Sequence, residues 1–213
     1  MSGLLVAGAG GHGKVVAETA HAMGAWGKIA FLDDRHETLQ GTLAFPVLGG
    51  MNKALDLKPE FSDLVVAVGD AATRQDLLKQ FAEKGFGLPS LIHPTAWVSP
   101  SSVMGEGTVV FAQAGVNADA HIGRGVIVNT GATVDHDCVI ADSVHVCPGV
   151  HLGGGVSIGS KSWIGIGCSV IQGVHIGERV MVGAGAAVIG DIADDLTVVG
   201  VPARAISSIR NMS

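Results

Sequence analysis

The feature of this chain that most constrains its fold is a six-residue repeat in its C-terminal half. One column of the repeat holds a large aliphatic side chain or a methionine at every sixth position. A second column, two residues before each of these positions, holds only small or β-branched side chains, from Ala96 to Ala186. Such a repeat is the signature of a parallel β-helix, in which both columns point inward and three hexads make one coil. The first column returns at every sixth position without a break: Val98, Met104, Val110, Val116, Ile122, Val128, Val134, Ile140, Val146, Leu152, Ile158, Ile164, Val170, Ile176, Val182 and Val188.

The residues between the two inward columns point outward and form three columns with a period of eighteen. One of these columns is apolar at four of its five positions: Val109, Ile127, His145, Trp163 and Met181. An exposed apolar stripe of this length usually marks an interface. We therefore expect this face to pack against another copy of the chain in a closed cyclic oligomer. The alternative is that the tail, residues 191–213 with an expected short helix at its end, covers the stripe.

The N-terminal half instead alternates short buried strands with helices. Strands are expected at residues 3–7, 29–32 and 64–68, with helices after the first strand and over 73–84. This order predicts a small parallel sheet with helices on its faces. We therefore predict a Rossmann-like α/β domain over residues 1–92 and a β-helix with a C-terminal tail over residues 93–213.

Ligands bind parallel sheets of this kind beyond the carboxyl ends of the strands. There the chain carries Gly8–Gly13, Asp33-Asp34 and Gly69-Asp70. The glycine loop partly resembles a dinucleotide fingerprint, and backbone N–H groups at a helix start bind phosphate. NAD is the first ligand that the loop suggests, although the acidic residue that usually accompanies this fingerprint is ambiguous in this sequence. The loop is not a Walker loop, because Val15 follows Lys14 where that motif needs serine or threonine. A purely structural turn is the alternative.

Composition narrows the classes of function. The net charge is −6 with a pI near 5.8, and no basic run is present, which argues against a nucleic-acid partner. The apolar runs are too short to span a membrane, and no signal peptide is apparent. The three cysteines lack metal-ligand spacing, and Cys138 and Cys168 occupy the small inward column. We therefore expect a cytoplasmic protein.

One histidine stands apart from the others in the repeat. His136 lies in a turn between Asp135 and Asp137, whereas His121, His145, His151 and His175 lie at outward strand positions. A neighbouring carboxylate can orient an imidazole and stabilise its protonated form, and histidine titrates near about 6.5, which suits a general base. The alternative is a surface histidine without a role. No two histidines have the spacing of zinc ligands, so we expect no metal.

Several segments together resemble the NeuD/PglD-type sugar acetyltransferases, and most closely the PglD-like enzymes and the acetyltransferase part of bifunctional PglB proteins. The matching segments are Gly8–Lys14, Phe31–Asp34, Asn129–Thr130 with Val134–Cys138, and Val199–Arg204. The resemblance implies a left-handed β-helix, a homotrimer with active sites between subunits, and acetyl-CoA as co-substrate. The implied reaction acetylates the 4-amino group of a UDP-4-amino-4,6-dideoxy-N-acetylglucosamine. Its product, UDP-N,N'-diacetylbacillosamine, serves bacterial protein glycosylation.

The resemblance also implies residue roles. His136 is the general base and Asp137 orients it; the family often has glutamate there, so the shorter side chain could lengthen this contact or pass it to Asp135. A backbone N–H within Gly153–Gly155 is expected to donate to the oxyanion. The residues implied to bind acetyl-CoA are His145, Gly154, Ile166, Gly183, Ala184 and Arg204. Those implied to bind the sugar nucleotide are Gly11, His12, Gly13, Asp33, Asp34, Arg35, Gly69 and Asn129.

Two other functions stay open at this point. One is the O-acetylation of sialic acid, as in NeuD itself, which would leave the nucleotide crevice without a purpose because free sialic acid carries no UDP. The other is a nucleotide-binding scaffold without catalysis, against which the Asp-His-Asp turn argues weakly.

Overall fold

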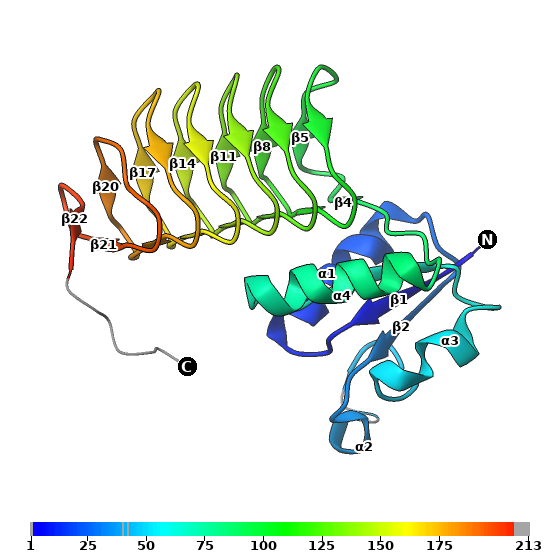
Figure 1. Ribbon diagram of the computed structural model, residues 1–213. Helices are drawn as coiled ribbons and strands as arrows, with labels where there is room; N and C mark the ends of the chain where they lie inside the picture. The colour runs from blue at the N-terminus through cyan, green and yellow to red at the C-terminus, as the bar shows by residue number, and fades with distance from the viewer. Residues whose placement is uncertain (1, 40, 42, 207–213) are drawn as a thin grey trace. The chain divides into compact units, whose positions relative to one another are not determined.

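The computed structural model describes residues 2–206 apart from residues 40 and 42, and the chain forms two compact units, Met1–Pro94 and Thr95–Ser213 (Figure 1). The first unit contains a parallel three-stranded sheet in the order β2-β1-β3. Its elements are β1 (Gly3–Ala7), α1 (Gly11–Met23), β2 (Lys28–Leu32), α2 (His36–Leu39), the 3₁₀ helix η1 (Met51–Lys53), α3 (Ala54–Leu57), β3 (Asp63–Val66), α4 (Ala71–Glu83) and β4 (Leu91–Ile92). The sheet, α1 and α4 follow the expected order, and the short helices α2, η1 and α3 are additions.

Alternate residues of the strands bury opposite faces of this sheet. Leu5 and Leu32 lie in a core cluster with Phe61 and with Leu78 and Phe81 of α4. On the other face, α1 buries Val16, Ala17 and Ala20. α4 begins at Ala71, earlier than expected, because Asp70 caps it: the Asp70 Oδ1 atom accepts a 2.8 Å hydrogen bond from the Thr73 N–H.

The second unit is a parallel β-solenoid with three sheets, one on each face (Figure 1). The first face holds β7 (Val109–Val110), β10 (Ile127–Val128), β13 (His145–Val146), β16 (Trp163–Ile164) and β19 (Met181–Val182). The second holds β5 (Trp97–Val98), β8 (Gly115–Val116), β11 (Thr133–Val134), β14 (His151–Leu152), β17 (Ser169–Val170) and β20 (Ala187–Val188). The third holds β6 (Val103–Met104), β9 (His121–Ile122), β12 (Val139–Ile140), β15 (Ser157–Ile158) and β18 (His175–Ile176).

The register of these sheets confirms the repeat. Thr133 pairs with Gly115 in the coil before it and with His151 in the coil after it, both eighteen residues away. The large column is buried throughout except at Val98 and Met104 in the first coil, where the side chains are half-buried. Cys138, Cys147 and Cys168 are free and buried, and desolvation raises the pKa of the Cys147 thiol to about 12.

One expectation about the surface is wrong. The sequence predicts an exposed apolar stripe on the first face, but Val109 is 2% exposed and Ile127 is 1% exposed, Trp163 is half-buried, and only Met181 is exposed. The repeat determines which side chains point away from the interior of the coil. It does not determine the exposed fraction of each of these side chains.

The tail ends the regular stack of coils. β21 (Thr197–Val199) pairs in parallel with β19, and β22 (Arg204–Ala205) pairs with β21 in the antiparallel direction. On the third face, Ile176 bridges to Ile192, sixteen rather than eighteen residues on. The expected short helix falls in residues 207–213, outside the described residues.

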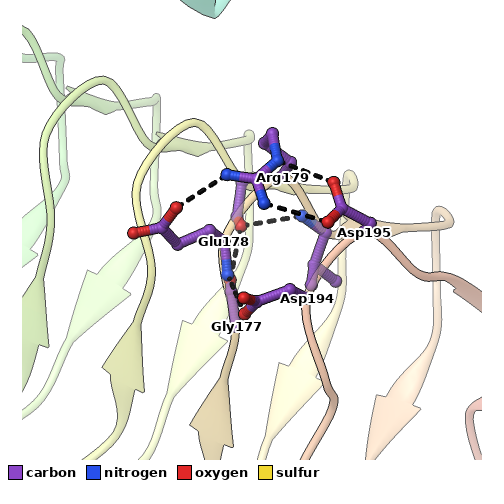
Figure 2. A network of polar contacts seen from close by, with 7 residues as sticks. Gly177, Glu178, Arg179, Asp194 and Asp195 are labelled. Carbon is purple, nitrogen blue, oxygen red and sulfur yellow. Dashed lines mark hydrogen bonds and ion pairs between the residues drawn. The ribbon is translucent and has the colours of Figure 1, made fainter.

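A polar network fastens the shortened last coil to its neighbour (Figure 2). The Arg179 guanidinium donates to both carboxylate oxygens of Asp195, at 2.6 and 2.9 Å, and to Glu178 at 2.7 Å. The Glu178 N–H donates to Asp194 Oδ1 at 2.9 Å. These contacts engage Arg179 with two carboxylates and hold the turns together where the repeat changes length.

Candidate active site

His136 lies in the turn between β11 and β12, on the edge where the second face meets the third, which we call the second edge. Its turns begin at Ser99, Asn117, Asp135, Gly153, Ile171 and Ile189. The His136 side chain is 61% exposed, and its Nδ1 atom lies 2.7 Å from Asp137 Oδ2. Asp137 has a φ of 58°, a left-handed conformation that aspartate tolerates better than most residues. The shorter acidic side chain therefore reaches the imidazole directly, and the contact does not pass to Asp135.

Two carboxylates raise the pKa of His136. The larger cause is the hydrogen bond with Asp137, and the charge of Asp135 adds to it. Because a carboxylate only accepts hydrogen bonds, the Nδ1 atom carries the proton in this contact, and the Nε2 atom keeps its lone pair when the ring is neutral. The turn thus presents an exposed imidazole nitrogen that can accept a proton.

Gly154, one coil further on, lies against the His136 ring. A Cβ atom at Gly154 would be 2.5 Å from Cε1 and 2.6 Å from Nε2 of His136. The Gly155 N–H donates to the His136 carbonyl at 2.8 Å, which ties the two turns together. Glycine at this position therefore makes room for the imidazole, in addition to the role expected for it at the thioester.

Asn129 and His145 also lie together, but in another part of the solenoid. The Asn129 Nδ2 atom is 3.1 Å from His145 Nε2, and the His145 ring packs edge-on against Trp163 at a centroid distance of 6.4 Å. His145 lies on the first face, and Asn129 lies in the turn between the first and second faces. In a triangular coil the second edge is opposite the first face. One chain therefore places His136 and His145 on opposite sides of the solenoid.

The other residues expected to bind acetyl-CoA lie toward the C-terminal coils. Ile166 and Ala184 are exposed in turns between the first and second faces. The Gly183 N–H donates to Val198 O at 2.8 Å, so this N–H is used by coil pairing. Arg204 is exposed on β22, and its Nη1 atom donates to the Ala203 carbonyl at 2.8 Å.

In the α/β unit, Asp33 connects two of the three loops expected at the nucleotide crevice. Its Oδ2 atom accepts the Ala9 N–H of the glycine loop at 2.9 Å, and its two carboxylate oxygens accept the Arg35 guanidinium at 3.1 Å each. The hydrogen bond from the Arg35 side chain is the main cause that lowers the pKa of the nearly buried Asp33 to about 2. The Arg35 guanidinium is therefore an exposed cation that Asp33 fixes beside Gly10. A Cβ atom added at Gly10 would lie 3.9 Å from Arg35 Nη2.

The other residues expected at the nucleotide crevice divide into exposed and packed positions. Gly11, Asp34 and Gly69 are exposed, and the Asp34 Oδ1 atom accepts the Met51 N–H at 2.9 Å. Gly13 is buried, and a Cβ atom there would collide with the Gly8 carbonyl oxygen, so Gly13 serves the packing of α1 against the loop. Burial, and then the charge of Arg74, lower the pKa of His12 to about 4, so His12 is neutral near neutral pH.

Sequence reasoning missed two residues. Arg74 of α4 is 1% exposed and donates to the Val68 and Gly69 carbonyls at 2.9 and 2.8 Å, where it supports the third crevice loop. Asn117 donates a hydrogen bond to Asp135 from one coil away. The spacing of eighteen residues indicates that Asn117 and Asp135 lie at equivalent positions of neighbouring coils, but it does not give the direction of their side chains.

The resemblance implies that His136 is a general base, and its raised pKa then predicts how acetyl transfer should depend on pH. A base acts in its neutral form, so we expect kcat/KM to rise with pH through a limb above 6.5. Asp137→Asn removes the largest cause of the raised pKa and keeps a residue that tolerates a positive φ. The limb should move to lower pH, and the plateau should fall because the ring loses its orienting acceptor. Measured pH profiles of both proteins test this; a limb at the same or higher pH in Asp137→Asn contradicts it.

Asp33 is expected to stabilise the α/β unit. Asp33→Asn should lower the free energy of unfolding by about 2 kcal/mol at neutral pH, as is usual for hydrogen bonds to a buried charge. Since folding lowers the pKa of Asp33 from 3.8 to about 2, its contribution is present above pH 4 and is lost as the pH falls through about 2. Urea unfolding measures this difference, with the exposed Glu18→Gln as control. Equal midpoints for the two variants would refute the expectation.

No helix in the described residues is long and apolar enough to cross a membrane. Within residues 2–39, 41 and 43–206, no cluster of three or more histidine, cysteine or acidic side chains is arranged to hold a metal ion.

Comparison with known proteins gives consistent matches to both units. The model of the PglD N-terminal domain family matches residues 3–81. UDP-N-acetylbacillosamine N-acetyltransferase of Bacillus subtilis (strain 168) is 41% identical over 114 residues, which are 53% of this chain. The match spans only 52% of that curated relative, about half of its length.

Solved structures match over nearly the whole chain. The acetyltransferase domain of PglB from Neisseria gonorrhoeae FA1090, in complex with acetyl coenzyme A, is 49% identical with a TM-score of 0.92 and covers 96% of this chain and 98% of its own. PerB from Caulobacter crescentus, in complex with CoA and GDP-perosamine, is 41% identical with a TM-score of 0.89 and covers 97% of this chain and 98% of its own.

The α/β unit followed by a β-solenoid, and the matches over nearly the whole chain, place the protein in the class of two-domain β-solenoid acyltransferases whose solved structures hold acetyl-CoA or CoA. Within this class, the chain belongs to the NeuD/PglD-type family of sugar acetyltransferases.

Proposed function

We propose that the protein N-acetylates the 4-amino group of a UDP-4-amino-4,6-dideoxy-N-acetylglucosamine with acetyl-CoA, giving UDP-N,N'-diacetylbacillosamine. The observation that carries the proposal is the exposed His136 imidazole, held at Nδ1 by Asp137 at 2.7 Å and lying against Gly154. The names of the relatives from Bacillus subtilis and Neisseria gonorrhoeae support the acceptor and the donor respectively.

In the proposed reaction His136 is the general base. The neutral sugar amine attacks the thioester carbonyl carbon, a C–N bond forms, and the C–S bond to CoA breaks. The Nε2 atom of His136 takes the proton that the amine nitrogen loses, and the CoA sulfur leaves as a thiolate that is then protonated. The imidazolium formed is stabilised by Asp137 and Asp135, which already raise the pKa of His136. The Gly154 backbone is the proposed donor to the developing oxyanion.

We further propose a homotrimer with active sites between subunits. His136 lies on the second edge, whereas His145 and Asn129 lie on the first face and at its border, so one chain presents them on opposite sides. A site that contains both groups needs a second chain. Closed cyclic assembly gives every such site the same composition.

Mixing two inactive variants tests this arrangement. If His136 and His145 act in one site from different subunits, co-expressed His136→Ala and His145→Ala chains form some sites with both histidines intact, about a quarter of all sites for random mixing. Activity should then return in the mixture. Mixed assemblies that stay as inactive as the separate variants would exclude the shared site.

For the sugar nucleotide, we propose that the crevice of the α/β unit binds the UDP part. The fixed Arg35 cation and the N-terminal end of α1 are suited to phosphate, His12 contributes a neutral hydrogen-bonding group, and Asp34 lies toward the uridine end. PerB binds GDP-perosamine, so a GDP-linked 4-amino sugar is the second acceptor that a specific observation favours.

The decisive experiment measures release of the CoA thiol from acetyl-CoA with a panel of acceptors. The panel contains UDP-4-amino-4,6-dideoxy-N-acetylglucosamine, its galacto epimer, GDP-perosamine and sialic acid. Release with the first alone supports the proposal. Release with GDP-perosamine alone moves the chain to the perosamine branch, and release with sialic acid alone moves it to O-acetylation. No release with any acceptor favours the non-catalytic scaffold.

A further inference from the structure

We propose that Asn117 is a positioning residue for this reaction: from one coil away, it holds the Asp135 carboxylate that anchors the His136 turn. The inference rests on the acetyltransferase function proposed above. It concerns a residue that does not touch the imidazole and that acts only through Asp135.

The backbone of Asn117 is held in place within the solenoid by two hydrogen bonds. Its backbone N–H donates to Val134 O at 2.9 Å in the next coil, and its carbonyl accepts the Ala120 N–H at 3.4 Å within its own turn. The side chain is half-buried. A short amide side chain on a backbone held in both directions has little freedom, so it can define the position of the group that it contacts.

The contact of Asn117 joins it to His136 through a single oxygen. The Asp135 Oδ1 atom accepts the Asn117 Nδ2 hydrogen bond at 2.9 Å and also accepts the His136 backbone N–H at 2.9 Å. The pKa of Asp135 is lowered, first by Asn117 and then by the His136 N–H. Because both donors share one oxygen, Asn117 sets the orientation of the carboxylate, and the carboxylate sets the position of the residue that carries the imidazole.

The Asn117–Asp135 pair adjoins the turn that contains His136, and no equivalent pair is found at the other described turns of the second edge. The first positions of its turns are Ser99, Asn117, Asp135, Gly153, Ile171 and Ile189. Beyond Asp135 these positions are glycine or isoleucine, and Ser99 bonds within its own turn to Ser101 at 3.1 Å. On the same edge a side chain also joins the preceding pair of coils, since the Asp119 N–H donates to Ser101 Oγ at 3.1 Å. The Asn117–Asp135 pair differs from that contact because its acceptor is the carboxylate that also holds the His136 N–H.

The choice of an amide also has an electrostatic consequence. The groups that face His136 are the carboxylates of Asp137 and Asp135 and the uncharged backbone of Gly154. Asparagine holds Asp135 without adding a third negative charge. An aspartate at position 117 would lose the donor and add such a charge, which favours the protonated imidazole.

The test uses the full chain and compares Asn117→Ala, Asp135→Ala, the double variant and Asn117→Asp. Asn117→Ala should lower kcat about tenfold or more with both KM values unchanged, because a small displacement of the base is costly. The double variant should lose no more than Asp135→Ala alone, since Asp135→Ala removes the oxygen through which Asn117 acts. Asn117→Asp should shift the acidic limb of the kcat/KM profile to higher pH.

Ser157→Ala is the matched control, because it also removes a side-chain hydrogen bond between neighbouring coils, the 2.8 Å contact with His175. It should keep the kcat of the wild-type protein. An unchanged kcat in Asn117→Ala, losses that add fully in the double variant, or an equal loss in Ser157→Ala would each overturn the inference.

Failure of the proposed function is distinguishable from failure of this inference. A wild-type protein that acetylates no acceptor contradicts the function. In that case the NMR resonance of the His136 backbone amide, which reports its bond to Asp135, decides the inference. It should shift in Asn117→Ala and stay in place in Ser157→Ala; an unchanged resonance in Asn117→Ala overturns the inference.

Discussion

Replacing His136 by alanine is expected to lower kcat/KM by about 10²- to 10⁴-fold, the range typical for removal of a general base. The imidazole is exposed, and its ring makes no contribution to the buried columns of the solenoid. The variant should therefore fold as the wild type does and bind the sugar nucleotide with unchanged affinity. Steady-state kinetics and calorimetric titration with the nucleotide product measure these two quantities separately.

His121→Ala is the control for this prediction. His121 is also an exposed solenoid histidine, and its Nδ1 atom contacts the Asp119 backbone carbonyl at 3.0 Å rather than a carboxylate. It should keep wild-type kinetics. Full activity of His136→Ala would refute the assignment of the base, and lost nucleotide binding in that variant would show that His136 acts in binding.

The second large effect is expected for Gly154→Ala. The added methyl group would lie 2.5 Å from Cε1 and 2.6 Å from Nε2 of His136, so the ring must turn away and its hydrogen bond with Asp137 must change. A displaced base of this kind can cost about 100-fold in kcat. Gly154 does not have a positive φ, so alanine is compatible with the backbone and the fold should persist.

Gly190→Ala separates this effect from a general intolerance of alanine. Gly190 occupies the same turn position on the second edge, two coils further on, and a Cβ atom there would meet nothing within 4 Å. It should keep wild-type activity and stability. If Gly154→Ala is as active as Gly190→Ala, the imidazole does not act from the position seen in this structure.

The period of six could be interpreted correctly because inward packing leaves no freedom. A large residue such as Val134 must fill the coil, and the outward position beside it follows without further information. The hand of the coil does not follow from this pattern, because a right-handed and a left-handed coil bury the same columns. The exposure of the apolar stripe was overestimated at Val109 and Ile127 for a related reason: the pattern gives the direction of a side chain but not its exposed fraction.

The candidate site was predictable where its contacts are local in sequence. His136 and Asp137 are adjacent, so their pairing followed from the Asp-His-Asp turn, and only the distance decided between Asp137 and Asp135. The loops that contain Ala9 and Asp33 were expected to converge, and the 2.9 Å hydrogen bond between them agrees. Contacts between coils were harder to find. The link from Asn117 to Asp135 and the proximity of Gly154 to the imidazole depend on side-chain direction, which spacing alone does not determine.

The coil repeat also sets distances along the axis of the solenoid. Each coil adds eighteen residues and advances the chain by one strand spacing, about 4.8 Å. The distance along the solenoid from the His136 turn to the β21–β22 hairpin is therefore set by the number of coils between them. Deleting one complete coil would keep every inward side chain in register and every strand on its own face, and would bring the hairpin one step closer to the imidazole. A deletion of six or twelve residues would keep the inward columns but move the strands that follow to another face, and a deletion that is not a multiple of six would disturb the inward columns. The reach along the solenoid, and hence the length of a ligand that can bridge both ends, changes only in these steps.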